Sequence, residues 1–160
     1  ADKLLAVLHL TNNAFSSFVT GQVTEAVILG TLCCLGMLLL GLPYALPVSV
    51  IIAALSLIPI FGAWIGAATG AFLIVFQSPI KALTFLIFLL ILQQVEGNLI
   101  YPRVVGKSVG LPGLWVLAAV TIGGGAFGIL GMLLGVPVCS VVYSLVQAYI
   151  RTKPEAEENQ

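Results

Sequence analysis

The sequence predicts an all-α membrane protein: a polytopic transmembrane helix bundle with two broken or re-entrant helical hairpins. Residues 108–150 contain no Asp, Glu, Lys, Arg or His, and residues 26–95 contain only Lys81. Charged residues make up 8% of the chain, whereas soluble domains carry roughly 25%. Because a helix of about 20 apolar residues crosses the hydrocarbon core of a bilayer, we expect the lipid bilayer to be a partner of this chain.

The first 42 residues predict two elements. Residues 1–21 are expected to form an amphipathic helix at the membrane surface, because apolar residues recur there at helical spacing. A first membrane span is expected over residues 22–42, with Thr24 as a cap, Glu25 at its positive end, and Gly41 and Pro43 as its stop. The chain thus divides into residues 1–21, a transmembrane permease domain over 22–150, and a disordered polar tail over 151–160.

Residues 44–76 are apolar but interrupted at their middle by Pro59 and Gly62. Proline removes a helical donor and glycine permits a reversal, so a re-entrant hairpin with its tip at residues 59–62 is expected. A single tilted and kinked helix is the alternative. Gly62, Gly66 and Gly70 lie four residues apart, which predicts a ridge for close helix packing.

A second full span is expected over residues 80–101, and it ends in a polar stretch that contains Gln93, Gln94, Glu96 and Asn98. Polar groups inside a bilayer usually face a cavity or a partner, so these side chains are candidates for a transport pathway. Glu96 and Arg103 could share a helix face if the helix continued past Pro102; a polar loop is expected from residue 103 to residue 110. The alternative is that Glu96 only reaches interfacial water.

Residues 111–149 form a second interrupted segment. We expect its break at Gly123, Gly124 and Gly125, with a further break near Pro137. Gly124 and Gly128, like Gly131 and Gly135, form GxxxG pairs, so Gly128, Gly131 and Gly135 are expected to serve helix packing. Interrupted segments in corresponding halves of a chain are typical of transporter sites. The candidate pathway residues are therefore Pro59, Gly62, Gln93, Gln94, Glu96, Asn98, Arg103, Gly123, Gly124 and Gly125.

Several other functions lack support in the sequence. The net charge is zero with no basic tract, so nucleic acid is not an expected partner. The G-x-G-x-x-G match at residues 123–128 lacks the acidic residue about 20 positions later that dinucleotide binding requires, and no cofactor is expected. The three cysteines lie in apolar runs without further metal ligands. We find no nucleophile–base pair, and we expect neither a metal site nor an enzyme.

The placement of Lys and Arg predicts the orientation. If both interrupted segments return to the side they enter from, five basic residues lie on one side and Lys81 alone lies on the other; the five are Lys3, Arg103, Lys107, Arg151 and Lys153. The positive-inside rule places the five-residue side in the cytoplasm.

Four stretches together resemble the autoinducer-2 exporter-like (AI-2E) permease family: F-x-x-GQ at residues 18–22, IPIFGAWIG at 58–66, EGNLIYPRVVGKSVGLP at 96–112, and the glycine-rich residues 123–135 followed by Pro137. The resemblance implies a multi-pass transporter of the bacterial inner membrane, a homo-oligomer that is a pentamer, and hairpins like those of elevator-type transporters. Some members are implicated in export of the quorum-sensing signal autoinducer-2, and others in sodium/proton exchange. Members begin with further spans, so we expect this chain to correspond to the C-terminal half.

Three functions remain as hypotheses. The first is a secondary transporter or exporter of a small polar solute, which is autoinducer-2-like by resemblance. The second is a sodium/proton antiporter that uses Glu96. The third is a membrane scaffold that transports nothing and uses its glycine ridges only for assembly.

Overall fold

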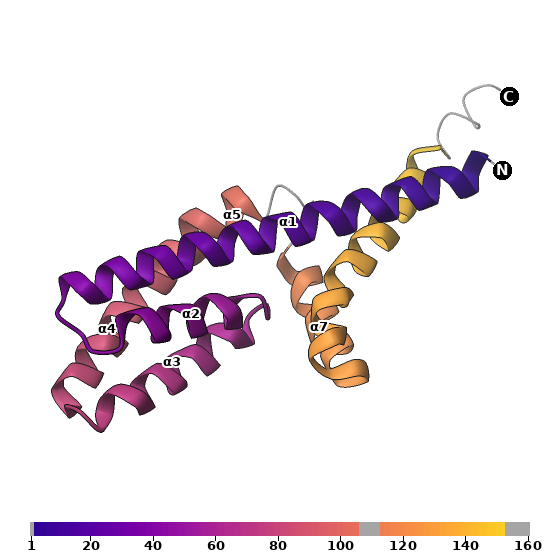
Figure 1. The fold of residues 1–160 in the computed structure, drawn as a ribbon. Coiled ribbons are helices and arrows are strands. Elements are labelled where there is room, and N and C mark those ends of the chain that lie inside the picture. The colour runs from indigo at the N-terminus through magenta and orange to yellow at the C-terminus, as the bar shows by residue number, and fades with distance from the viewer. Residues whose placement is uncertain (1, 106–112, 153–160) are drawn as a thin grey trace, which may run out of the picture. The chain divides into compact units, whose positions relative to one another are not determined.

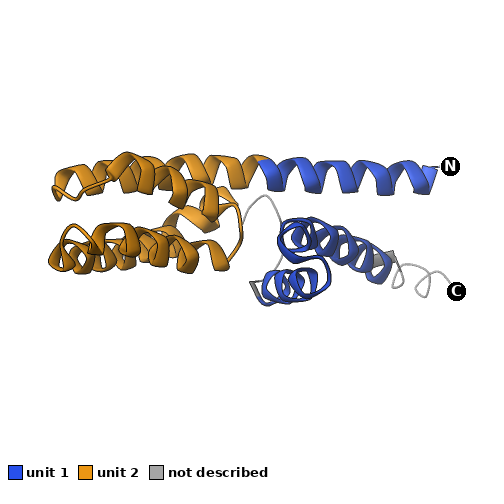
Figure 2. Cartoon of the chain, turned by 60° about the horizontal axis from the view of Figure 1, so that its bottom comes forward, with its two compact units in different colours: residues 1–19, 108–160 blue, residues 20–107 orange. Residues whose placement is uncertain are grey.

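The structure, a computed structural model, describes residues 2–105 and 113–152, and the regular structure in these ranges is helical throughout (Figure 1). This confirms the predicted all-α class. The chain forms two compact units, one of residues 20–107 and one of residues 1–19 with 108–160 (Figure 2).

Helix α1 (Asp2–Leu39) is continuous, so the predicted amphipathic helix and the first span form one element. Thr24 does not cap a helix, because its hydroxyl donates to the carbonyl of Thr20 (2.7 Å) within α1. Glu25 likewise lies in the middle of the helix, far from the dipole's positive end. The predicted stop is correct: Gly41 adopts φ 63°, and the amide of Leu42 donates to the carbonyl of Met37 (2.9 Å) to close the last turn.

Helices α2 (Ala45–Ser56) and α3 (Phe61–Val75) pack against each other as a hairpin, as predicted for residues 44–76 (Figure 1). Residues 57–60 form the turn, in which Ile60 has a φ of 68°. The Gly62–Gly66–Gly70 ridge is buried. A Cβ on Gly62 would lie 1.9 Å from the carbonyl oxygen of Leu55, so the two helix backbones touch at this point and only glycine fits.

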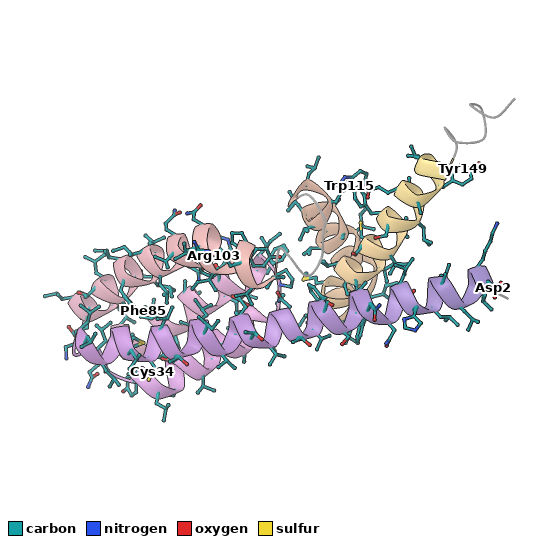
Figure 3. The ribbon with its side chains drawn as sticks, turned by 90° about the horizontal axis from the view of Figure 1, so that it is seen from above. Asp2, Cys34, Phe85, Arg103, Trp115 and Tyr149 are labelled. Atoms are coloured by element: carbon teal, nitrogen blue, oxygen red, sulfur yellow. The ribbon has the colours of Figure 1, made fainter. Side chains whose placement is uncertain are left out.

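Helix α4 (Pro79–Val95) is capped at its N-terminus by Ser78, whose hydroxyl accepts a hydrogen bond from the amide of Lys81 (3.4 Å). It continues through a π-helical segment, η1 (Glu96–Ile100), into the short α5 (Tyr101–Val104). Phe85 of α4 is fully buried (Figure 3). It belongs to an apolar core from α1 to α4 that also contains Leu29, Cys33, Met37, Leu42, Ala45, Val48, Ile52, Ile74, Ala82, Leu89 and Leu92. This core holds the hairpin against α1 and α4.

In the other unit, the segment α7 (Gly113–Thr152) is itself a helical hairpin. The chain reverses at Gly128, with φ 65° and ψ −140°. The predicted reversal at Gly123, Gly124 and Gly125 is therefore wrong, and so is a break near Pro137, which lies within the second helical arm. Gly123 instead lies where the arms cross, since a Cβ on it would be 2.1 Å from the carbonyl oxygen of Gly131. Gly131 and Gly135 lie in close contact with the first arm. The predicted packing role of Gly128 is wrong, because a Cβ there would meet nothing within 4 Å and its mirror-image φ/ψ requires glycine for the turn.

Three helical segments are long and apolar enough to cross a membrane by length and composition: Asp2–Leu39, Pro79–Val104 and Leu114–Ile150. The third is divided at Gly128, and its first arm, about 15 residues or ~22 Å long, is shorter than the ~30 Å hydrocarbon core. Large apolar side chains such as Leu39, Ile80 and Phe127 are more than three-quarters exposed, and such a surface fits a lipid environment. Residues 153–160 of the predicted tail lie outside the described residues.

Candidate functional site

A small polar cluster lies within the unit of residues 20–107. Gln22 and Glu25 come from α1, Glu96 is the first residue of η1, and Tyr101 begins α5. Gln22 is 4% exposed and Glu25 is 2% exposed. Burial of polar groups is costly unless they are hydrogen-bonded or paired, so their partners define what the cluster can do.

The partner of Glu96 is Glu25. Their carboxyl groups lie within hydrogen-bonding contact, and both interact electrostatically with the hydroxyl of Tyr101. Glu25 and Glu96 are the two acidic residues of the entire stretch from residue 3 to residue 154. The fold therefore brings together two acids that are 71 positions apart in the sequence.

The π-helical segment explains why Glu96 does not face Arg103. In a π turn the amide of Tyr101 donates to the carbonyl of Glu96, five residues back. The extra residue rotates the next helical turn by about 100° relative to a regular helix. Arg103 lies on α5 (Figure 3) and is exposed. In the described part of the chain it forms no ion pair with Glu96. The predicted shared face is wrong, although the helix does continue past Pro102 to Val104. Residues 106–110 of the predicted loop lie outside the described residues.

Gln22 connects this cluster to the α2–α3 hairpin. Its Nε2 donates to the carbonyls of Ser56 and Leu57, at 3.4 Å each. These carbonyls belong to the C-terminal end of α2, where backbone acceptors lack intrahelical partners. Its Oε1 is buried and has no hydrogen-bond partner among the described residues. One side of the amide is thus anchored to the hairpin, and the other side offers a free acceptor.

The remaining predicted polar residues lie elsewhere. Gln94 and Asn98 are exposed, and Asn98 Nδ2 donates to both the backbone carbonyl (2.8 Å) and Oε1 (3.2 Å) of Gln94. Gln93 is half-buried. Pro59 and Gly62 belong to the hairpin tip, within five residues of the carbonyl of Leu57 that Gln22 contacts. The structure therefore brings Glu96 to Glu25 and the end of α2 to Gln22, and it leaves Gln94, Asn98 and Arg103 exposed.

The triple glycine belongs to the other unit and has apolar surroundings. Gly123 borders a groove of about 710 Å³ along α7, which is lined by apolar side chains and glycines and includes Trp115, Phe127 and Leu130. A Cβ on Gly124 would meet only the flexible side chain of Met132, and one on Gly125 would meet nothing within 4 Å. Among the described residues, the groove beside Gly123 has no polar lining that could contact a polar solute.

Gln22, Glu25 and Tyr101 were missed as candidates by sequence reasoning. A signal was available, because Gln22 and Glu25 lie three residues apart on one helix face in an otherwise apolar region. The sequence alone favours an interpretation of Glu25 as a residue that stabilises the start of a helix. This interpretation does not hold, because α1 continues through residue 25.

Comparisons with known proteins agree on one family. A family model described as "AI-2E family transporter" matches residues 1–151. The chain is 38% identical over 165 residues to "Putative transport protein YueF" of Bacillus subtilis, and the alignment covers 97% of this chain and 43% of that protein. It is 33% identical to "Putative transport protein YrrI" of the same organism, over 94% of this chain and 42% of that protein.

A more distant relative is "Putative permease PerM" of Escherichia coli, 29% identical over 86% of this chain and 40% of that protein. The chain thus spans less than half the length of the curated relatives that it matches. No solved structure matches the chain. The family model covers nearly all of the sequence, and the resemblance seen in its motifs is confirmed: this chain belongs to the AI-2E family of membrane transporters.

Proposed function

We propose that the protein is a secondary transporter that exports a small polar solute, autoinducer-2-like by resemblance, across the bacterial inner membrane as a homo-oligomer, a pentamer by the same resemblance. The observation that carries this proposal is the buried amide of Gln22, anchored to the broken end of α2 with its Oε1 free. A hydrogen-bonding group held at a helix break inside an apolar bundle is the arrangement by which transporters bind polar solutes.

A counterflow assay tests this proposal. The protein is reconstituted into vesicles loaded with unlabelled autoinducer-2, and uptake of labelled autoinducer-2 is measured; ribose serves as a second neutral, hydroxyl-rich solute. Gln22→Leu removes both the anchor and the free acceptor, and we expect it to reduce counterflow at least tenfold. Gln94→Leu is the matched control, because Gln94 is an exposed amide whose bonds are to Asn98. Absence of counterflow in the unmodified protein for both solutes would favour the scaffold hypothesis.

A second candidate, a sodium/proton antiporter, is supported by the contact between Glu25 and Glu96. Exchange of a proton for a cation requires a buried acid, and the partly buried Glu96 has a fully buried acidic neighbour. Sodium addition to vesicles that are acidic inside should then release protons, as followed by a pH-sensitive dye. The solute transporter predicts counterflow without this sodium-dependent release.

A further inference from the structure

We propose that Glu25 and Glu96 form a single proton-binding site, in which two carboxyl groups from different helices share one proton. One consequence rests on the proposed transport function: the proton bound at this site is coupled to movement of the α2–α3 hairpin. Its chemistry rests on the geometry of the cluster alone.

The contact between the two carboxyl groups is the first observation. A hydrogen bond between two carboxyl groups needs a proton on one of them, because an ionised carboxylate only accepts. Two ionised carboxylates in contact would also repel each other strongly in a site that excludes water. Glu25 is 2% exposed, so water cannot screen that repulsion. One proton removes both difficulties at once.

No basic group offers an alternative source of positive charge among the described residues around the pair. Tyr101 of α5 is the other titratable neighbour. Helices α2 and α3 contain no Asp, Glu, Lys, Arg or His. Lys81 of α4 is exposed and lies 15 positions, or about 22 Å of helix, from Glu96. Arg103 is exposed on α5.

Gln22 is the second, independent observation. It lies one turn before Glu25 on the same face of α1, is 4% exposed, and has a buried Oε1 without a partner in the described chain. An amide oxygen only accepts hydrogen bonds, so it is suited to a protonated carboxyl and not to a carboxylate. Nε2 of the same amide donates to the carbonyls of Ser56 and Leu57, so a hydrogen bond from the protonated carboxyl to Oε1 would link the proton to the end of α2.

Infrared spectroscopy of the reconstituted protein measures the proton directly, without any transported solute. A protonated carboxyl shows a C=O stretch that a carboxylate lacks, and this band should disappear as the pH rises. We expect Glu25→Gln to abolish the band at neutral pH, because the remaining Glu96 is only half-buried. We expect Glu96→Gln to lower the pH at which the band disappears, because the acidic neighbour of the buried Glu25 is then gone. Asp2→Asn, which changes an exposed acid on the same helix α1, is the matched control and should leave the band intact.

Two outcomes would overturn the proposal. One is the absence of a carboxylic band in the unmodified protein at neutral pH. The other is a band that disappears at the same pH in Glu96→Gln as in the unmodified protein, which indicates an isolated buried acid. Counterflow of autoinducer-2 in the same variants separates this proposal from the proposed function. A shared proton that drives transport predicts that a pH gradient accelerates counterflow in the unmodified protein. It also predicts that this acceleration, measured relative to each preparation's own counterflow without a gradient, is lost in Glu25→Gln. Loss of counterflow in every preparation, with the shared band present, would refute the transport function and leave the proton site standing.

Discussion

Replacement of Gly62 by alanine tests the packing of the α2–α3 hairpin most directly. An alanine Cβ would lie 1.9 Å from the carbonyl oxygen and 2.6 Å from the carbonyl carbon of Leu55. Both atoms belong to the backbone, so no side-chain rotation relieves the clash. The helices must separate by about 1.1 Å at this point to restore even 3.0 Å, the lower limit of real Cβ contacts.

The cost of that separation can be bounded. Overpacking of a well-packed interior costs about 1–3 kcal/mol, and we expect Gly62→Ala to lie near ~3 kcal/mol because the obstacle is backbone. Gly66→Ala should cost less, since its Cβ would meet the side chain of Ile52 at 3.2 Å. Gly97→Ala should be neutral or stabilising by up to about 1 kcal/mol, because nothing lies within 4 Å and alanine favours helix.

The assay is SDS-induced unfolding in mixed detergent micelles, followed by helical circular dichroism and by tryptophan fluorescence, for which Trp64 on α3 is a local probe. The expected order of the unfolding midpoints is Gly97→Ala, then Gly66→Ala, then Gly62→Ala as the least stable. If Gly62→Ala unfolds at the same SDS fraction as Gly97→Ala, the close crossing of α2 and α3 is refuted.

Three further predictions concern topology, the second hairpin and Arg103. Cysteines placed at Ser78 and Ser108, in a background without the native cysteines, should react from opposite sides of the membrane, because five basic residues are predicted on one side and one on the other. Reaction of both from outside in intact cells would contradict the orientation. Gly128→Ala should destabilise the α7 hairpin by about 1–3 kcal/mol because alanine is strained at φ 65°. Gly125→Ala should have no measurable effect, and equal SDS midpoints for the two variants would argue against a reversal at residue 128. Arg103→Gln should leave the carboxylic infrared band unchanged because Arg103 is exposed; a changed band would restore the acid–base pair that the sequence suggests.

The sequence by itself determined the class of this protein and the location of its first hairpin. Long charge-free runs indicate a helical membrane protein, because a helix satisfies all of its backbone hydrogen-bonding groups within one segment when it lies in lipid. Pro59 marks the turn of the first hairpin through local backbone chemistry, and Gly41 marks the end of α1 in the same way. These effects act within a few residues, so they can be read from the sequence. Gly62 lies next to the hairpin turn, but the structure uses it for close contact between α2 and α3 and not for the reversal.

The tertiary structure decided where the second hairpin reverses and which polar groups meet. Several glycines lie between residues 123 and 135, and each could permit a reversal. Only the packing of the two arms against each other assigns the crossing to Gly123 and Gly131 and the turn to Gly128. Glu25 meets Glu96 because the helices pack and a π turn redirects the chain, and neither event has a strong local signal. Contacts between residues 71 positions apart depend on the whole core, and for this reason the candidate site emerged only from the fold.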